Sequence, residues 1–373
     1  MPARNKKIKL TGIFVRLIFA TNLIAIFLLL VSHLAWYVSP LKTNLFSYLG
    51  LAFGIILFFN VAYLLLWLLF SKWKLALISF ISLLICYKPI LTFFPLHLFP
   101  QKEPDNSIHV LTYNVQGFIN DRSKKTKDTP VLTYISDTDA DIVCIQEYLI
   151  SKTGHSLKTQ QDVNRILNKY PYKSVIPLKY SGKHHTYGLA CFSKYPIENS
   201  KRIDFSSSFN GAAIHTINID GKKVTVVNTH LESNGITSED KELYGKFLLN
   251  ADKTNFEDVA TNIRTRLGKA YRERVVQVAK VKRELEHIQS DAVIICGDFN
   301  DTPISYSYAK MKKGMVDAFT DSGFGPGISY NEDFFWFRID NIFHSPNMKA
   351  YNAKVDRVKY SDHYPVRAYL EIQ

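Results

Sequence analysis

The first hundred residues contain no aspartate or glutamate, and this feature divides the chain into two unlike parts. Three long apolar runs fill the region, at Ile13–Val38, Leu45–Phe70 and Leu75–Phe94. Crossing a bilayer takes about 20 mostly apolar helical residues, and a soluble domain of this size would carry surface carboxylates. The pattern predicts a membrane anchor over residues 1–100, with transmembrane helices near 13–38, 45–70 and 75–94, rather than a soluble core.

The third run is the weakest of the three, because Lys88 and Pro89 interrupt it. A lysine near a helix end can extend its ammonium group to the membrane surface, and membrane helices tolerate proline. Interfacial aromatic residues stand near the ends of the runs: Trp36, Tyr37, Tyr48, Trp67 and Trp73. The first run is too long for a cleaved signal peptide, and no small-residue cleavage site is evident.

Positive charges predict the orientation of the anchor, since lysine and arginine are enriched in cytoplasmic loops. They gather in the N-terminal segment and the second loop, at Arg4, Lys6, Lys7, Lys9, Lys72 and Lys74, whereas the first loop carries Lys42 alone. Three crossings then put residues 101–373 outside the cytoplasm, facing the periplasm or cell surface if the cell is bacterial, with the anchor in its inner or plasma membrane. If the third run does not cross, this part is cytoplasmic.

The net charge of +13 does not by itself indicate a nucleic-acid partner, because nine of the 46 basic residues lie in the anchor. Residues 101–373 hold 37 basic and 33 acidic residues, so this part is only mildly basic and weakly favours a polyanion. The cysteines Cys86, Cys144, Cys191 and Cys296 lie in separate apolar runs without zinc-type spacing. They predict buried thiols, which fit the cytoplasmic alternative slightly better.

Three prolines between Pro95 and Asn106 indicate a linker, with residues 101–107 joining the anchor to a second domain over 108–373. Strands are predicted at 108–113, 141–146, 172–177, 187–193, 212–219, 222–227, 292–296, 338–343 and 367–372, and helices at 131–136, 156–169 and 256–289. Asp220 and Gly221 form a strong hairpin signal. Residues 234–255 are predicted as a loop or irregular helix, and Gly323–Gly327 as a flexible loop.

The most informative stretch is 292–303, AVIICGDFNDTP. Five apolar residues predict a buried strand, Gly297 ends it, and Asp298 and Asn300 follow two positions apart. Alternate side chains at a strand end point the same way, so this carboxylate and carboxamide can face one point. Such a pair suits a hydrated metal ion and a water nucleophile. A polar turn after a core strand is the alternative.

Other predicted strands also end in, or contain, polar residues. Asn114, Glu147 and His230 each lie at the end of an apolar strand, and Asp340 lies inside one, where a carboxylate needs a partner. Asp362 and His363 stand side by side before the last strand, which suits acid–base chemistry, with a plain turn as the alternative. Arg274 and Gln277, one turn apart on the long helix, are candidates to tie it to the sheet. Phe334–Phe337 is predicted as core, with a substrate- or lipid-facing rim as the alternative.

Taken in order, these pieces resemble the endonuclease/exonuclease/phosphatase superfamily of pancreatic-type deoxyribonucleases, sphingomyelinases and inositol-polyphosphate 5-phosphatases. The matching segments are TYNVQG (112–117), IQE (145–147), NTHLES (228–233), GDFND (297–301), RIDNIF (338–343) and SDHYPV (361–366). They span almost all of 108–373 in the family's order. The resemblance implies an α/β, four-layer α-β-β-α sandwich of the DNase I-like kind, with two packed, mainly antiparallel sheets and helices outside.

The resemblance also implies roles for individual residues. Asn114 and Glu147 resemble the principal metal ligands and Asp362 a further metal-side carboxylate, with Mg2+ as the implied ion and Mn2+ as the alternative. His230 and Asn300 resemble residues that contact the scissile phosphate and its oxygens. Asp298 resembles the residue that positions or deprotonates the attacking water. Asp340 resembles the carboxylate that orients His363, described in the family as a general base or a transition-state stabiliser.

The chain departs from the family pattern at three places. Gln116 stands where some members carry a second metal-side acid, which leaves a second metal site in doubt. His230 stands where abasic-site nucleases have a different segment, which disfavours base-excision repair. Asn341 replaces a frequent tyrosine, a change that we interpret as tolerable.

Together the two parts predict a membrane-anchored, divalent-metal-dependent hydrolase of phosphate esters, foremost a phosphodiesterase that uses metal-assisted in-line attack of water. Nucleic acid, a phospholipid head group and a soluble phosphate ester are the three candidate substrates. The membrane is the other expected partner, and no protein partner is evident. The alternative is a non-catalytic phosphate-ligand-binding module tethered to the membrane, and a membrane structural or assembly protein is the least supported.

Overall fold

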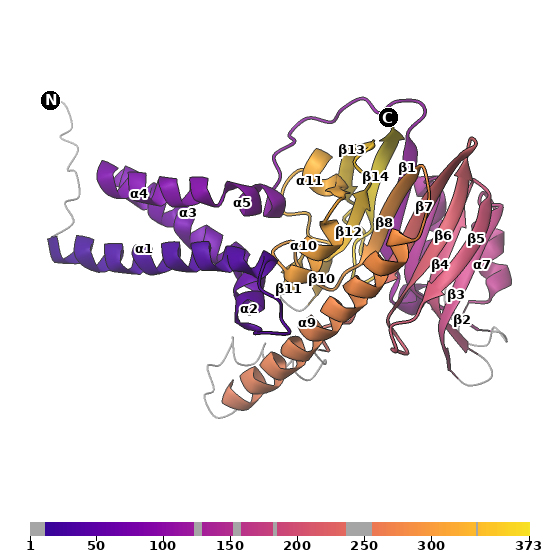
Figure 1. Cartoon of the computed structure of the whole chain (residues 1–373), viewed down its shortest axis with the longest axis horizontal. Helices are drawn as coiled ribbons and strands as arrows, with labels where there is room; N and C mark the ends of the chain where they lie inside the picture. Colours follow the sequence, from indigo (N-terminus) through magenta and orange to yellow (C-terminus); the bar gives the residue numbers. More distant parts are fainter. Residues whose placement is uncertain (1–11, 123–128, 152–157, 182–184, 236–255, 333–334) are drawn as a thin grey trace. The chain divides into compact units, whose positions relative to one another are not determined.

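The computed structural model describes residues 12–122, 129–151, 158–181, 185–235, 256–332 and 335–373, which form two compact units (Figure 1). One unit holds the chain up to Phe93 together with Ile304–Tyr306, and the other holds Phe94–Pro303 and Ser307–Gln373. The boundary at Phe93 lies one residue before the end of the third apolar run.

The first unit is helical, as the apolar runs predict, but two of the runs are broken. The helices are α1 (Gly12–Ser32), η1 (His33–Trp36), α2 (Leu45–Leu51), α3 (Phe53–Leu69), α4 (Trp73–Ile85) and α5 (Tyr87–Phe93). Among the described residues, Gly12–Trp36 alone is an unbroken helix long and apolar enough to cross a membrane. The pairs α2–α3 and α4–α5 bend by 62° and 69°, so up to three spans result if each pair is one span. Pro89 lacks the N–H that would continue the helix from α4, which accounts for the second break.

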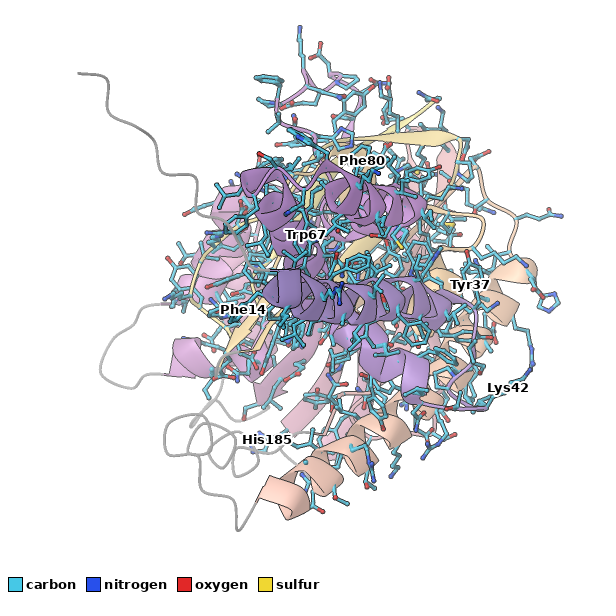
Figure 2. All side chains as sticks on the ribbon, turned by 90° about the vertical axis from the view of Figure 1, so that its left-hand side faces the viewer. Phe14, Tyr37, Lys42, Trp67, Phe80 and His185 are labelled. Carbon is cyan, nitrogen blue, oxygen red and sulfur yellow. The ribbon has the colours of Figure 1, made fainter. Side chains whose placement is uncertain are left out.

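Buried polar side chains join the helices of this unit, and many large apolar side chains lie on its surface. Trp67 is fully buried, and its Nε1 donates to Asn22 Oδ1 at 2.9 Å. Ser79 donates to the same oxygen at 3.0 Å, so one buried asparagine joins α1, α3 and α4. Phe14 and Phe80 are exposed on the surface of the helices (Figure 2). This distribution is the reverse of that in a water-soluble domain.

The second unit contains two six-stranded sheets, as the resemblance implies. The first has the order β13-β14-β1-β2-β4-β3 and the second β5-β6-β7-β8-β12-β9. The strands of the first sheet are β1 (Ile108–Asn114), β2 (Ile142–Ser151), β3 (Tyr172–Ser181), β4 (His185–Ser193), β13 (Met348–Val355) and β14 (Val366–Ile372). Those of the second are β5 (Ile197–Ile203), β6 (Gly211–Ile219), β7 (Lys222–His230), β8 (Ala292–Asp298), β9 (Val316–Asp317) and β12 (Asp340–His344). Among the strand pairs of the described residues, only β1–β2 and β7–β8 are parallel, which confirms two mainly antiparallel sheets.

Three apolar clusters make this unit a four-layer sandwich. One fills the space between the sheets and includes Val110 and Val226. Helices α6 (Pro130–Thr138) and α7 (Gln160–Ile166) cover the first sheet, and α9 (Phe256–Glu286) and α10 (Tyr306–Lys312) cover the second. All four cysteines are buried free thiols, as predicted. The remaining elements are η2 (Gln116–Arg122), α11 (Ala318–Ser322) and a hairpin of β10 (Tyr330–Glu332) and β11 (Phe335–Phe337).

Some local predictions are confirmed and others are wrong. Asp220 and Gly221 form the predicted hairpin turn, with φ of 51° and 86°. The helix predicted over 156–169 is shorter, because Thr159 and Asp162 form a capping box that starts α7 at Gln160. The prediction for Phe334–Phe337 as core is wrong at Trp336, which is 61% exposed on the short hairpin. Most of the predicted loop 234–255 lies outside the described residues, as do the basic residues of the N-terminal segment.

Gly297 permits the close pairing of β7 with β8 next to the predicted site. Its φ is +136°, and a Cβ there would lie 1.9 Å from the Thr229 carbonyl oxygen. We expect Gly297→Ala to destabilise the fold by about 3 kcal/mol, because a backbone atom rather than a flexible side chain must move. Thermal unfolding measures this, as a drop of roughly 6–12 °C in Tm.

The control for that measurement is Gly221→Ala. Gly221 also has positive φ, but nothing lies within 4 Å of its added Cβ, so only backbone strain of about 1 kcal/mol is expected. Equal losses of Tm in the two variants would contradict the close-approach explanation.

Candidate active site

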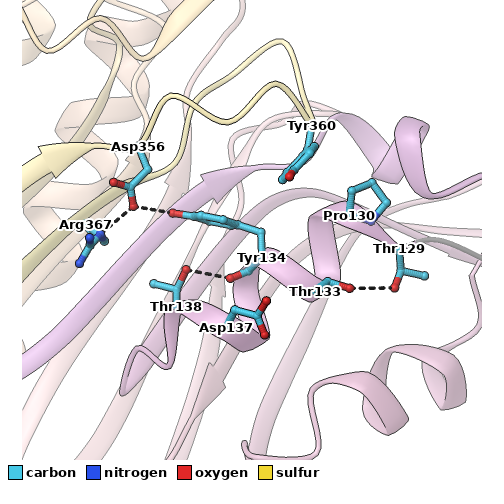
Figure 3. Close-up of a pocket in the computed structure, with 9 residues that line it drawn as sticks. All are labelled: Thr129, Pro130, Thr133, Tyr134, Asp137, Thr138, Asp356, Tyr360 and Arg367. Carbon is cyan, nitrogen blue, oxygen red and sulfur yellow. Dashed lines mark hydrogen bonds and ion pairs between the residues drawn. The ribbon is translucent and has the colours of Figure 1, made fainter.

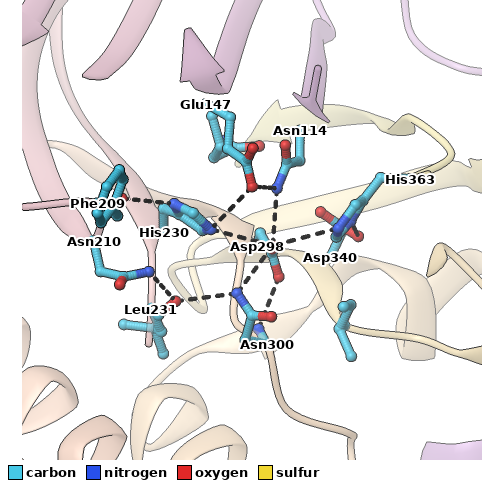
Figure 4. Close-up of polar contacts among 12 residues, drawn as sticks. Asn114, Glu147, Phe209, Asn210, His230, Leu231, Asp298, Asn300, Asp340 and His363 are labelled. Atoms are coloured by element: carbon cyan, nitrogen blue, oxygen red, sulfur yellow. Dashed lines mark hydrogen bonds and ion pairs between the residues drawn. The ribbon is translucent and has the colours of Figure 1, made fainter. Parts of the chain in front are cut away.

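The ends of strands from both sheets meet at one edge of the sandwich and carry the predicted polar residues (Figure 4). Parallel pairing sets His230 of β7 beside Asp298 of β8, and Asn114 of β1 beside Gln146 of β2. Antiparallel pairing sets Asp340 of β12 opposite Asp298. Register therefore brings together His230, Asp298 and Asp340 of the second sheet, and the hydrogen bond from Asn114 to Asp298 at 3.1 Å joins them to the first sheet.

Asp298 is the centre of the cluster. Its carboxylate accepts hydrogen bonds from Asn114 Nδ2 at 3.1 Å and from the Asn300 backbone N–H at 2.8 Å. Its Oδ2 lies 3.6 Å from Nε2 of His230 and 3.6 Å from Nε2 of His363. Burial raises the pKa of Asp298 above its ordinary value, and the neighbouring imidazoles oppose that shift. The result is a buried carboxylate between two imidazole rings.

His363 is fixed by the carboxylate that the resemblance assigned to it. Its Nδ1 lies 2.8 Å from Asp340 Oδ2, which leaves Nε2 facing Asp298. Burial lowers the pKa of His363, but the charges of Asp340 and Asp298 outweigh burial and raise the pKa well above the usual histidine value. The two carboxylates therefore favour the protonated, imidazolium form of the ring. The uncharged Ser329 holds Asp340 in place, because its Oγ accepts a hydrogen bond from the Asp340 backbone N–H at 3.0 Å.

His230 faces the cluster from the other side. Its Nδ1 donates to the Phe209 carbonyl at 3.1 Å, because a carbonyl oxygen can only accept. Nε2 is thereby directed to Glu147 Oε1 at 3.7 Å and to Asp298. Two imidazole Nε2 atoms consequently face one carboxylate oxygen from opposite sides, as Figure 4 shows.

Glu147 reaches the cluster through a β-bulge. The register of β2 against β4 shifts between Ile145 and Tyr148, and Glu147 has φ of +53° inside the strand. Such a conformation is uncommon for glutamate and costs of order 1 kcal/mol. Its Oε1 accepts from Asn114 Nδ2 at 3.1 Å. The backbone strain therefore coincides with a side chain aimed into the candidate site.

Asn300 lies beside Asp298 and contacts it through its side-chain amide. Its Nδ2 donates to the Leu231 carbonyl at 3.0 Å and to Asp298 Oδ2 at 3.1 Å, which uses both amide hydrogens. Its left-handed φ of 51° is one that asparagine tolerates. In this arrangement Asn300 orients Asp298, and its predicted contact with phosphate oxygens would require the amide to turn.

The cluster carries an excess of negative charge, which bears on metal binding. Glu147, Asp298, Asp340 and Asp362 contribute four carboxylates, so two negative charges remain even when both histidines are protonated. The cavity beside them has a volume of about 240 Å³, and none of its described lining residues is lysine or arginine. A divalent cation would balance this charge, and the carboxylate and carboxamide oxygens of Glu147, Asp362 and Asn114 are the donors that Mg2+ prefers.

Asp298, Asp340 and His363 also offer ligand atoms within 4.8 Å of one another. This trio fits a metal less well. The Asp340–His363 hydrogen bond already uses two of its atoms, and an imidazolium cannot ligate a cation.

Arg274 and Gln277 tie helix α9 to the edge of the site, as predicted. Arg274 is completely buried, and its Nη1 donates to the Glu232 carbonyl at 2.7 Å and to Asn234 Oδ1 at 3.0 Å. Gln277 accepts from the Glu232 backbone N–H at 2.8 Å. Asn234 and its neighbours Ser233 and Gly235 line the cavity. The helix thus positions one wall of the site.

We expect Arg274→Lys to lower kcat/KM by about tenfold, because an ammonium group cannot make the forked contacts that hold the 232–235 wall. Steady-state kinetics on a phosphodiester, with circular dichroism to confirm folding, measures the effect. Arg272→Lys is the matched control, since Arg272 lies on the exposed face of the same helix. Equal kinetics for the two variants would contradict a positioning role for Arg274.

Two residues below the site escaped prediction. Gln146 Nε2 donates to Asn228 Oδ1 at 2.7 Å, and Asn228 donates to the carbonyls of Ile145 and Ala190. These buried amides join the two sheets directly beneath Glu147 and His230. The sequence signal for these two residues was their position in the IQE and NTHLES segments. Each of them looked like an ordinary polar neighbour of Glu147 or His230.

A larger cavity of about 720 Å³ lies beside α6 (Figure 3). Its central carboxylate, Asp356, already accepts from Tyr134 Oη at 2.8 Å and from Arg367 Nε at 2.7 Å. These contacts hold the pKa of Asp356 below its ordinary value despite its burial. The Asp356 carboxylate in this cavity is therefore already paired with Arg367, whereas no lysine or arginine is among the described residues that line the cavity beside Asp298.

Residues 111–363 match a family model described as the Endonuclease/Exonuclease/phosphatase family, and residues 15–93 match a model described as a domain of unknown function. The comparison with curated proteins gives no match. Similar solved structures include an endonuclease/exonuclease/phosphatase family protein from Leptotrichia buccalis, with 16% identity, TM-score 0.49, and coverage of 71% of this chain and 99% of that one.

Two other solved structures are similar. The endonuclease/exonuclease/phosphatase from Bacteroides vulgatus has 18% identity and TM-score 0.48, over 72% of this chain and 99% of its own. The humanized D. rerio TDP2 has 16% identity and TM-score 0.48, over 72% of this chain and 100% of its own.

Proposed function

The chain belongs to the endonuclease/exonuclease/phosphatase family, and from this premise we propose that it is a divalent-metal-dependent phosphoesterase, foremost a phosphodiesterase, tethered to a membrane. The family supports hydrolysis of phosphate esters. The observation that carries the proposal is the placement of the Asp298 carboxylate between His230 and the Asp340–His363 pair. In this proposal residues 108–373 are the catalytic domain and residues 1–100 the anchor.

The chemistry follows from these contacts. Asp298 orients the attacking water and takes its proton as the water oxygen bonds to phosphorus. The bond from phosphorus to the leaving oxygen then breaks. The His363 imidazolium, held by Asp340, and Nε2 of His230 offset the negative charge that grows on the phosphoryl oxygens. Burial strengthens each of these interactions, because little water competes with them.

Asn114, Glu147 and Asp362 would hold the metal ion, with Mg2+ as the foremost ion and Mn2+ as the alternative. A cation bound there supplies Lewis-acid polarisation of a phosphoryl oxygen. Burial raises the pKa of Asp362, although the charge of His363 opposes the shift. Asp362 therefore needs a nearby cation to ionise fully, more than an exposed aspartate does. Gln116 provides no second acidic ligand, so we propose one metal ion.

Membrane attachment is supported by Gly12–Trp36, which is long and apolar enough to span a bilayer. The buried Asn22 contacts and the exposed phenylalanines of the helical unit also suit a lipid surrounding. A catalytic domain outside the cytoplasm remains our prediction. Protease accessibility of the second unit in sealed right-side-out and inverted vesicles tests it.

The substrate class is decided by turnover. The full chain in detergent with Mg2+ would be assayed on plasmid DNA, RNA, vesicles of sphingomyelin or phosphoinositide, bis-p-nitrophenyl phosphate and p-nitrophenyl phosphate. Salt-sensitive cleavage of DNA indicates a nuclease, and release of phosphocholine or inositol phosphate indicates a lipid head-group phosphodiesterase. Bound Mg2+ without turnover on any substrate would favour the non-catalytic phosphate-binding module instead.

We expect Asp340→Asn to move the alkaline limb of the kcat–pH profile to lower pH. Burial lowers the pKa of His363, and Asp340 is the largest of the charges that raise it, so the imidazolium of the variant is lost at lower pH. Asp317→Asn is a control, because that buried carboxylate pairs with Arg338 and lies in another network. An unmoved alkaline limb in Asp340→Asn would contradict the charged form of His363.

A further inference from the structure

The segment that leaves the helical unit is fastened to the second unit instead of forming a free linker. The Pro95 carbonyl accepts from the Gly325 N–H at 2.9 Å, and the His97 N–H donates to the Gly323 carbonyl. His97 Nε2 lies 3.0 Å from the Thr320 carbonyl oxygen. Further along, Asn352 both accepts from and donates to the backbone of Gln101. The loop Gly323–Gly327, which was predicted to be flexible, therefore binds this segment through backbone hydrogen bonds.

The fastened segment presents a patch of exposed apolar side chains. We define this linker patch as the side chains of Phe94, Leu96, Leu98, Phe99 and Phe324. The rings of Phe94 and Phe324 lie 6.0 Å apart, and Leu96 pairs with Phe324 through a β-bridge. Leu98 and Phe99 are 65% and 83% exposed.

Exposed large apolar side chains of the second unit are concentrated in the linker patch instead of being spread evenly over its surface. Among the described residues from Phe94 onward, ten large apolar side chains are exposed, and five of them belong to the linker patch. The other five are distributed over five separate elements or loops. A concentrated apolar patch held in a fixed shape indicates a contact surface.

The short stretch of chain between the anchor and the linker patch indicates what covers the patch. Phe93 is the last residue of α5 and lies one residue before the end of the third apolar run. Six residues of extended chain reach at most about 20 Å, so the whole segment to Phe99 stays close to wherever that run ends. Lys354 and Arg357 line the same groove as Leu98 and Phe99. Lys354 pairs with Asp356 at 3.1 Å, so the positive charge that suits anionic lipid head groups is that of Arg357.

We propose that the linker patch inserts into the interface of the same bilayer that holds the anchor, and so seats the catalytic domain against the membrane. This inference rests on the membrane anchoring proposed above. Apolar side chains at this depth bury about 5–10 Å into the head-group region. The occupant is a phospholipid surface, not a second protein. A fastened segment with its patch inserted would limit rotation of the second unit relative to the membrane, whereas a free linker would allow it.

The test uses the full chain with Phe99→Cys, labelled with an environment-sensitive fluorophore and reconstituted in phosphatidylcholine–phosphatidylglycerol vesicles. The four native cysteines are buried, so the label goes to the new thiol. Tyr172→Cys is the matched control, because Tyr172 is an exposed aromatic residue on β3, outside the patch. Leu98→Cys serves as a second reporter in case Phe99→Cys does not fold.

Lipids that carry a nitroxide on the acyl chain are expected to quench position 99 by about twofold and to leave position 172 unquenched, as interfacial burial of a single site requires. Equal quenching at both positions, or none at either in chains that float with the vesicles, overturns the proposal. A blue shift at position 99 without quenching by lipid identifies a second copy as the occupant and also overturns it. Chains that fail to float after an alkaline wash refute the anchor itself, whereas soluble-substrate turnover tests the phosphoesterase independently.

Discussion

Asp298→Asn is expected to lower kcat by about 10³-fold while leaving the fold and the affinity for Mg2+ nearly unchanged. The asparagine has the same shape and keeps the hydrogen bonds that its Oδ1 accepts, but it cannot take a proton from water. Among the described residues, Asp298 is the one acidic side chain that contacts Asn114, Asn300 and both imidazoles. Single-turnover kinetics on a phosphodiester, with Mg2+ affinity measured calorimetrically, separates the two effects.

The matched control for Asp298→Asn is Asp301→Asn. Asp301 lies three residues further along the same turn and is also buried, but it contacts Arg274 at the back of the wall instead of the histidines. We expect it to reduce activity far less than Asp298→Asn does. A comparable loss in both variants would mean that the turn as a whole, not the Asp298 carboxylate, is what matters.

Glu147→Gln is expected to have the opposite signature, with Mg2+ affinity weakened by about tenfold to a hundredfold and activity partly restored by added Mg2+. Removing one negative charge from a cluster with two in excess reduces the attraction for a divalent cation. The side chain reaches the site only through the bulge and its φ of +53°, so the backbone strain serves that one carboxylate. Isothermal titration with Mg2+ and the Mg2+ dependence of kcat measure both effects.

A control for Glu147→Gln is Glu198→Gln. Glu198 lies on the edge strand β5, where its Oε1 accepts from Asn218, remote from the cluster. Unchanged Mg2+ affinity in Glu147→Gln would move the metal to the Asp298, Asp340 and His363 trio. In that case Asp340→Asn should weaken Mg2+ binding instead.

Much of the site could be predicted because its residues stand at the ends of strands. The alternation along 292–303 placed Asp298 and Asn300 without any structure, and a carboxylate inside a strand, Asp340, required a partner. The family resemblance, and not sequence spacing, identified His363 as this partner. The structure places His363 Nδ1 2.8 Å from Asp340 Oδ2.

The features that escaped prediction depend on contacts distant in sequence. The bulge at Glu147 arises from the register of β2 against β4, which the local sequence does not reveal. The amide turn of Asn300 toward Leu231 depends on the loop after β7. Trp336 looked like core because its neighbours are aromatic, but three-residue strands form a hairpin too small to bury both faces.

The anchor shows the same division between local and distant causes. Composition alone predicted apolar helices over the first hundred residues, and α1 follows that prediction closely. The bends of 62° and 69° in the second and third runs could not be read from hydropathy, which is insensitive to the direction of a helix. The attachment of the linker to Gly323–Gly325 was equally hidden, because it joins segments more than 220 residues apart.

The most direct test of the central claim is hydrolysis of bis-p-nitrophenyl phosphate by the purified full chain in the presence of Mg2+. The account predicts turnover that EDTA abolishes, that added Mg2+ restores, and that Asp298→Asn reduces by about 10³-fold with the fold intact. Turnover that survives both EDTA and Asp298→Asn would contradict it, as would a folded, Mg2+-loaded chain that hydrolyses neither this compound nor any nucleic acid or phospholipid.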